Sequence, residues 1–304
     1  MAVFKPLLVI SNVIVDEIVL PDGGTRTALG GAGTYAAVGA AGWWPAVSIV
    51  AGIGRDLKEF TLEELPFLQP AAIGFLLRDE HTIRTRIEYL TDGERRETPL
   101  LGLEHFERMQ ITPEDVPDAL LPAAGTYCFR DLSQPFWQAL GRRDRQLGVT
   151  LWELQGSAAT SESWPALQRL LPLIDIFSLN LPEARRLFGA LEIQQIITDL
   201  LIAGADVILL RMGALGAVLA NRRTRLRLQP PRSPIVDVTG AGNSFCGAFL
   251  GAWCATHDLE QAGRAAAAAA ACCMADFGPP RSLNTAMLAE LAAATQIEHI
   301  GAVT

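Results

Sequence analysis

The chain is almost without lysine: its 304 residues include only Lys5 and Lys58, and its formal net charge is −8. A chain of this charge presents no positive field to nucleic acid, and it has no basic run interleaved with aromatic residues. Nucleic acid is therefore not an expected partner. Because lysine is so scarce, the charge of any phosphate-bearing ligand would have to be neutralised by arginine or by backbone N–H groups. The arginine candidates are Arg55 and Arg211.

The sequence also lacks segments that would bring it to a membrane or to an oxidising compartment. No basic stretch with an apolar core and a cleavage site opens it, and the apolar run near residues 265–275 is too short to cross a bilayer. A cytoplasmic protein with no membrane partner is predicted. The four histidines show no metal-ligand spacing. The five cysteines include no Cys-x-x-Cys pair, which predicts reduced thiols.

Motifs of other nucleotide-binding folds are missing as well. No Gly-x-x-x-x-Gly-Lys-Ser/Thr run occurs, which excludes a P-loop enzyme at the level of motifs. Residues 31–36 imitate a dinucleotide fingerprint, but no buried parallel strand is predicted before them. A dehydrogenase is therefore not expected.

The most informative feature that is present is the run Asp-Val-Thr-Gly-Ala-Gly-Asn-Ser-Phe at 237–245. Residues 234–238 predict a short apolar strand before the turn, and residues 244–254 have the apolar spacing of a helix after it. Gly240 and Gly242 let the main chain approach a ligand closely. Since N–H groups at a helix N-terminus attract phosphate oxygens, the turn is predicted to be an anion hole. The alternative is a tight connection whose glycines serve packing alone.

The same run resembles the C-terminal signature of the ribokinase-like, or PfkB, family of carbohydrate and nucleoside kinases, Asp-Thr-Thr-Gly-Ala-Gly-Asp-x-Phe. The matching positions are Asp237, Thr239, Gly240, Ala241, Gly242 and Phe245. In that family the second Asp takes the proton from the hydroxyl that attacks the γ-phosphate of ATP, whereas this chain has Asn243. A positioned general base contributes about 10²–10⁴ in rate. The resemblance therefore implies a catalytic turn of Gly240, Ala241, Gly242 and Asn243 with slowed transfer.

Two N-terminal segments resemble the substrate side of the family. Residues 7–16 are similar to its opening strand, which ends in an Asp that hydrogen-bonds sugar hydroxyls. The next segment resembles the substrate-side Gly-Gly turn, with Tyr35 where many members place Asn. The resemblance implies substrate contacts for Asp16, Asn12, Gly30, Gly31 and Tyr35. Asp16 also has an alternative reading, as a turn or cap residue at the end of a strand.

Two later segments resemble the nucleotide side. Asn180-Leu-Pro-Glu183 is similar to the Asn-x-x-Glu motif that organises Mg²⁺ and phosphates, with Glu183 acting through water, and residues 207–217 are similar to the strand and Gly-x-x-Gly turn beside the nucleotide. The implied cofactor contacts are Asn180, Glu183, Arg211, Gly213, Gly216, Asp237 and Thr239. Asp237 is also a candidate for holding a monovalent cation, K⁺. Alternatively, Asn180 and Glu183 simply start a helix, as an N-cap and the acidic residue three positions on.

Apolar runs alternate with helical stretches along most of the chain. The expected strands are 7–15, 46–52, 125–129, 149–153, 174–178 and 206–210, and the expected helices between and after them are 33–41, 134–146, 162–171, 183–188, 193–203, 242–255, 260–275 and 285–294. This alternation predicts a mostly parallel sheet covered by helices on both faces. Together with the resemblance, it predicts one ribokinase-like domain over 1–304, a three-layer α/β/α sandwich with a small lid.

One segment departs from this rhythm. Residues 82–89 alternate apolar and polar side chains, and Asp92-Gly93 offers a hairpin turn. By resemblance, residues of about 17–29 and 74–104 would form a β-strand lid over the sugar, and lids of two copies could pair edge to edge in a homodimer. A plain surface hairpin is the alternative. The residues expected to select the acceptor are Thr34, Tyr35, Arg84 and Arg86.

Two functions remain open from the sequence. The first is phosphorylation of a hydroxyl group on a sugar, polyol or nucleoside by Mg·ATP, slow because Asn243 replaces the base. The second is a catalytically impaired nucleotide- and sugar-binding or regulatory protein that retains the kinase fold. Acceptor-dependent ADP formation distinguishes them.

Overall fold

A large, mostly parallel sheet runs through the part of the chain that the computed structural model describes, residues 4–20, 22–59, 74–90, 95–280 and 284–301. Within those residues its strands lie in the order β14-β13-β12-β11-β10-β9-β8-β1-β4-β5. In chain order they are β1 (Leu7–Ile10), β4 (Val47–Gly54), β5 (Phe75–Asp79), β8 (Gly125–Arg130), β9 (Val149–Leu154), β10 (Ile176–Asn180), β11 (Val207–Arg211), β12 (Ala217–Asn221), β13 (Arg225–Gln229) and β14 (Gln296–His299). Pairing is parallel from β5 to β11 and antiparallel from β11 to β14.

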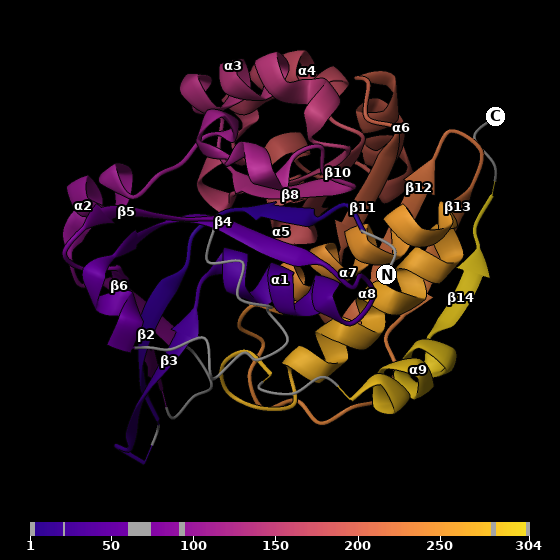
Figure 1. Ribbon diagram of the computed structural model, residues 1–304. Helices are drawn as coiled ribbons and strands as arrows, with labels where there is room; N and C mark the ends of the chain where they lie inside the picture. Colours follow the sequence, from indigo (N-terminus) through magenta and orange to yellow (C-terminus); the bar gives the residue numbers. More distant parts are fainter. Residues whose placement is uncertain (1–3, 21, 60–73, 91–94, 281–283, 302–304) are drawn as a thin grey trace.

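Helices cover both faces of this sheet (Figure 1). One face packs against α3 (Gln134–Arg143), α4 (Trp164–Leu170), α5 (Leu181–Phe188) and α6 (Ile193–Ile202). The other face packs against α1 (Ala32–Ala41), α7 (Ala241–Thr256) and α8 (Leu259–Cys273), with α9 (Thr285–Ala294) beside α8. Side chains of one strand alternate between the two cores, since Leu8 lies in the first and Leu7 in the second. The predicted α/β/α sandwich is confirmed.

Glycines bring α1 and α7 into close contact. A Cβ on Gly39 would lie 2.2 Å from the carbonyl oxygen of Ser244, and one on Gly247 would lie 1.9 Å from that of Ala36. The two backbones can therefore pack without intervening side chains. This contact sets Tyr35, one turn earlier on α1, directly against the turn that begins α7.

A smaller sheet forms the lid. Its strands are β3 (Thr25–Gly30), β2 (Ile14–Val19), β6 (Ile83–Tyr89) and β7 (Arg95–Pro99), in that spatial order. β6 and β7 pair antiparallel, which confirms the hairpin, although Asp92-Gly93 lies outside the described residues. Figure 1 shows the lid strands on the side of the molecule that carries α1, far from β14.

Three expectations about strands need correction. The apolar run 7–15 is two strands, because the chain leaves the large sheet after β1 and enters the lid at β2. β5 falls within 74–104, the range expected to build the lid, but it pairs with β4 in the large sheet. Residues 234–238 form no strand, and three of their apolar side chains are exposed: Ile235, Val236 and Val238.

Asp56, which follows β4, ties the lid to the large sheet. Its carboxylate accepts hydrogen bonds from the Thr82 N–H at 2.7 Å, the Thr82 hydroxyl at 2.8 Å and Arg84 Nη2 at 2.8 Å. Burial alone would raise the pKa of Asp56, but these bonds outweigh it and hold the pKa below its ordinary value. The donors come from two residues: Arg84 lies in β6, and Thr82 directly precedes it. Asp56 therefore anchors β6 at its start.

Asp56→Asn is expected to lower the free energy of unfolding by about 1.5–3 kcal/mol, because charge-assisted bonds become neutral ones. A depressed carboxyl pKa contributes stability above the unfolded pKa of about 3.9 and loses it as pH falls through the folded value. The difference between variant and wild type should therefore shrink in acid. Urea unfolding at neutral and acidic pH measures it, with Glu80→Gln as an exposed-pair control expected to change stability by under about 1 kcal/mol. A difference that stays constant in acid would contradict the role of Asp56.

None of the helices in the described part of the chain is long and apolar enough to span a membrane.

Candidate active site

The turn before α7 requires its two glycines. Gly240 caps the helix with φ 73°, in the left-handed region, and a Cβ there would lie 2.1 Å from Cγ of Tyr35. A Cβ on Gly242 would lie 1.9 Å from Nη1 of Arg211. Any side chain at either position would displace Tyr35 or Arg211. Glycine is therefore required at both positions because neighbouring side chains approach the backbone closely.

Two amides of the turn are available to an anion. Among the described residues no acceptor receives the N–H of Gly242 or of Asn243, and both belong to the first turn of α7, where the helix offers no partner. Ala241 differs from the expectation, because its N–H donates to the carbonyl of Val238 at 3.3 Å. The aligned helix dipole adds to the attraction for negative charge.

Asp237 and Thr239 fix the approach to this turn. Asp237 is 4% exposed, and one carboxylate oxygen accepts both the Thr239 N–H at 2.9 Å and the Thr239 hydroxyl at 2.7 Å. The Tyr89 hydroxyl, at the end of lid strand β6, lies 3.0 Å from the Thr239 hydroxyl. The lid therefore contacts the turn before α7 directly, and Tyr89 also packs edge-on against Phe277.

A buried polar network lies beneath the turn. Arg211 Nη1 pairs with Glu153 Oε1 at 2.8 Å, and the side chains of Arg211 and Glu153 are 13% and 3% exposed. The Tyr127 hydroxyl donates to Glu153 Oε2 at 2.7 Å. Asn243 Nδ2 lies 3.1 Å from the Tyr127 hydroxyl and 3.1 Å from Glu153 Oε2. One positive and one negative group thus meet directly behind the amides.

Asn180 and Glu183 form a capping box at the start of α5. Asn180 Oδ1 accepts the Glu183 N–H at 2.8 Å, while the Glu183 carboxylate accepts the Asn180 backbone N–H at 2.7 Å and its amide Nδ2 at 2.8 Å. Burial raises the pKa of Glu183, against the opposing effects of the Asn180 N–H and of Arg211. The geometry is therefore that of the alternative, in which the two residues start a helix as N-cap and third residue. Both carboxylate oxygens of Glu183 already accept hydrogen bonds from Asn180.

The other predicted cofactor residues divide by position. Arg211, at the end of β11, contacts the turn, whereas Arg55 forms an exposed ion pair with Glu80 at 2.9 Å. Gly213 and Gly216 lie in the β11–β12 connection with φ 59° and 84°. A Cβ on Gly216 would meet the carbonyl of Leu228 at 1.8 Å, but one on Gly213 would meet nothing within 4 Å.

The predicted substrate residues gather where β2, β3 and α1 meet. Asp16 is 5% exposed. Its carboxylate packs against Gly30, where an added Cβ would lie 1.9 Å from Asp16 Oδ2. The Asn12 carbonyl accepts the Gly33 N–H at 2.9 Å and lies 2.9 Å from a Cβ on Gly31. The resemblance-based group is thus one spatial cluster.

Tyr35, the remaining predicted substrate residue, contacts the turn before α7. It is 3% exposed, and its ring lies against Gly240. Burial above all raises the pKa of Tyr35 well above its ordinary value, with smaller contributions from Cys273, Asp16 and Asp237. Its hydroxyl is therefore neutral, and the ring fills the space beside Gly240 at the start of α7.

Sequence reasoning missed Tyr127, Glu153 and Tyr89. A signal existed for Glu153, because a carboxylate inside the apolar run 149–153 needs a buried partner. Tyr127 and Tyr89 gave no comparable signal, since an aromatic side chain in a strand is common.

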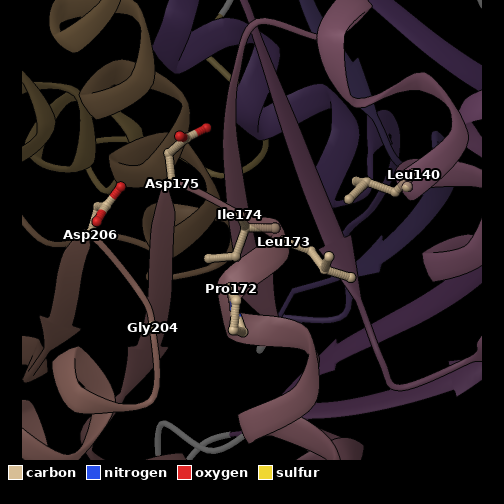
Figure 2. Close-up of a pocket in the computed structure, with 8 residues that line it drawn as sticks. Leu140, Pro172, Leu173, Ile174, Asp175, Gly204 and Asp206 are labelled. Atoms are coloured by element: carbon tan, nitrogen blue, oxygen red, sulfur yellow. The ribbon is translucent and has the colours of Figure 1, made fainter.

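A separate pocket of about 270 Å³ opens at the other end of the large sheet. Figure 2 shows Asp175 and Asp206, which directly precede β10 and β11, near Pro172 and Gly204. The predicted catalytic, substrate and cofactor residues all lie away from it, toward the carboxyl ends of the strands. This pocket is therefore not the candidate site.

A parallel α/β sandwich whose lid meets a glycine turn at a helix N-terminus defines a small-molecule kinase of ribokinase-like fold. The chain belongs to the pfkB family carbohydrate kinases, because the model of that family matches residues 16–286. It is thus a phosphotransferase of the type that uses an alcohol group as acceptor.

Three relatives illustrate the family. A cytidine kinase of Thermococcus kodakarensis is 25% identical over 268 residues, covering 84% of this chain and 91% of that protein. Ribokinase of Arabidopsis thaliana, complexed with ribose and ATP, has a TM-score of 0.73 at 21% identity, covering 95% of this chain and 99% of the other. A putative ribokinase II of E. coli, in complex with ATP and Mg²⁺, has a TM-score of 0.74 at 17% identity, covering 96% and 99%.

Proposed function

We propose that the protein transfers the γ-phosphoryl group of ATP to a hydroxyl of a sugar, polyol or nucleoside, and that it does so slowly. The observation that carries the proposal is the pair of free amides, Gly242 and Asn243, at the start of α7 with Arg211 directly behind them. Amides and a buried cation preorganised around a transferring phosphoryl group stabilise its charge. The cytidine and ribose named for two relatives support a ribose-containing acceptor.

The chain's own residues divide the work. Asp16 orients the acceptor hydroxyl, the turn amides receive the phosphoryl oxygens, and the lid excludes water through Tyr89. The acceptor oxygen forms the new bond to phosphorus while the bond to the bridging oxygen of ADP breaks. Asn243 stands where the family carries its acid and cannot take the proton, so the proton passes to a phosphate oxygen or to water, which makes turnover slow.

The residues present fit Mg²⁺ through water. This ion usually keeps several waters and is held by one or two carboxylates together with substrate phosphates. By resemblance Glu183 is the residue that would hold the ion, and because both of its oxygens are bonded to Asn180 it would reach the ion through a water. When bound, Mg²⁺ neutralises charge on the β- and γ-phosphates.

Two further features are proposed on resemblance. Asp237 and Thr239, which share a tight hydrogen-bonded turn, are candidates for holding K⁺, and replacing KCl by NaCl in the assay tests this. The exposed edges of the lid are candidates for pairing in a homodimer, which sedimentation measures.

The alternative function is a binding or regulatory protein. One observation favours it. The Asn243 amide donates to Tyr127 and Glu153, Tyr127 in turn donates to Glu153, and none of these three side chains is a free base that could take the proton of an acceptor hydroxyl. The test is to incubate the protein with Mg·ATP and a panel of sugars, inositols and nucleosides and to measure ADP. ADP that depends on an acceptor supports the kinase. Nucleotide binding by calorimetry without acceptor-dependent ADP supports the alternative and contradicts the kinase.

Tyr35→Asn is expected to widen acceptor choice. The ring fills the space against Gly240, so its removal should raise kcat/KM for the bulkiest accepted compound relative to the smallest by about tenfold. Steady-state kinetics over the acceptor panel measures the ratio. Tyr35→Phe is the matched control and should leave the ratio unchanged, since it keeps the ring. Equal selectivity in all three proteins would show that Tyr35 does not shape the acceptor site.

A further inference from the structure

The orientation of the Asn243 amide is fixed by two buried neighbours. Its Nδ2 lies 3.1 Å from the Tyr127 hydroxyl and 3.1 Å from Glu153 Oε2, and Tyr127 and Glu153 are 0% and 2% exposed. Glu153 pairs with Arg211 through Oε1, and a carboxylate in an ion pair only accepts hydrogen bonds. The Tyr127 hydroxyl directs its only O–H bond to Glu153, so toward Asn243 it too can only accept a hydrogen bond.

Both neighbours of Asn243 are therefore acceptors. An amide with two acceptors on one side must direct its N–H bonds there and its oxygen to the other side. Asn243 also lies in the first turn of α7, where neither its own N–H nor that of Gly242 has an acceptor among the described residues. Its Oδ1 is consequently the polar atom that side chain offers toward the reacting groups.

We propose that Glu153 is a positioning residue that, with Tyr127, holds Asn243 Oδ1 toward the acceptor hydroxyl. This inference rests on the proposed kinase function. Asn243 then accepts a hydrogen bond from the hydroxyl and aligns its oxygen with the phosphoryl group, without taking the proton. Orientation of this kind is a rate contribution separate from base catalysis.

The same contact makes an acid at position 243 unfavourable in this chain. An aspartate there would place its carboxylate at the distance Asn243 Nδ2 now has from Glu153, 3.1 Å. Two carboxylates at such a separation cannot both ionise easily, so they would share a proton and titrate as a pair with one raised pKa. Asn243→Asp alone would thus create a carboxylate pair that holds one proton more tightly than an isolated carboxyl group does, which weakens the new base.

Glu153→Gln should have opposite effects on kcat in the protein with Asn243 and in the Asn243→Asp variant. Arg211 needs an acceptor, so the Gln oxygen would face Arg211 and its NH₂ group would face position 243. With Asn243 this places two donors together and turns the amide over, which removes Oδ1 from the acceptor hydroxyl. With an aspartate at 243 the same NH₂ group becomes a hydrogen-bond donor to the new base.

The experiment compares wild type, Glu153→Gln, Asn243→Asp and the double variant with Mg·ATP and each compound of the acceptor panel. We expect Glu153→Gln to lower kcat of the wild type about tenfold and to raise kcat of Asn243→Asp about tenfold. The pH profile of Asn243→Asp should show a raised apparent pKa that returns to the ordinary carboxyl range in the double variant. A purely structural Glu153 would lower kcat in both backgrounds and leave the profile in place, and that result would overturn the proposal.

A measurement without turnover separates this inference from the proposed function. In protein labelled with ¹⁵N at asparagine, the two Asn243 Nδ2 protons should exchange slowly in the wild type and faster in Tyr127→Phe, which removes one acceptor and keeps the ring. Rapid exchange in the folded wild type would overturn the proposed orientation. Absence of acceptor-dependent ADP from every protein, with slow exchange retained, would instead contradict the kinase function and leave the fixed amide supported.

Discussion

Gly242→Ala is expected to reduce kcat for phosphoryl transfer by about 10²–10³, the loss typical of removing a donor that stabilises developing negative charge. The added methyl group would lie 1.9 Å from Nη1 of Arg211, so either the guanidinium leaves Glu153 or the turn opens. Either movement separates the amides from the positive charge behind them. Steady-state kinetics with the acceptor that the panel identifies measures this, and the free energy of unfolding should fall by about 1–3 kcal/mol through overpacking.

Gly141→Ala provides the matched control. Gly141 lies in α3, where an added Cβ meets nothing within 4 Å, and helical alanine is favoured over glycine by about 0.5–1 kcal/mol. This variant should be slightly more stable and fully active. If Gly242→Ala retained wild-type kcat while folding normally, the turn would not be the phosphoryl site.

Much of the architecture follows from local chemistry. Alternating apolar strands and amphipathic helices gave the sandwich, because each such segment must bury one side against a neighbour. The turn before α7 was predictable because Gly240 sits at a φ of 73°, which few other residues adopt. The Asn180–Glu183 capping box was also readable, since it needs only four consecutive residues.

Features that depend on register between distant strands were not predictable. Glu153 on β9 lies directly opposite Ser178 on β10. Arg211 on β11 reaches across β10 to form its ion pair with Glu153. Tyr127 reaches the same carboxylate from β8 on the other side. No local pattern specifies that three strands place these groups together, so the charged network beneath the turn emerged only in three dimensions.

Two of the three errors about strands, those at residues 7–15 and 234–238, have a similar origin. Only Ser11 and Asn12 interrupt the apolar run after residue 7, and the chain crosses between the two sheets at this point, where the Asn12 carbonyl accepts the Gly33 N–H. Residues 234–238 are apolar but their N–H groups at Val236 and Asp237 donate to the Met274 carbonyl instead of to a sheet. Apolar character alone therefore did not distinguish a buried strand from an exposed extended segment.

Arg211→Met is expected to lower the free energy of unfolding by about 3–5 kcal/mol, because it leaves Glu153 as an uncompensated charge whose side chain is 3% exposed. Methionine keeps much of the apolar volume, so the loss reflects charge more than packing. A buried carboxylate without a partner penalises the fold only while it is ionised. The deficit should therefore be largest near neutral pH and diminish in acid.

Urea unfolding of Arg211→Met and of Arg211→Met/Glu153→Gln tests this account of the pair. The double variant removes the unpaired charge and should recover at least half of the loss, because replacing both partners of a buried pair costs far less than removing one. Arg55→Met is the surface control: its partner Glu80 is exposed, and the change should cost under about 1 kcal/mol. A double variant no more stable than Arg211→Met would mean that Arg211 stabilises the fold by packing, and its charge could then no longer be assigned to holding Glu153 and the turn in place.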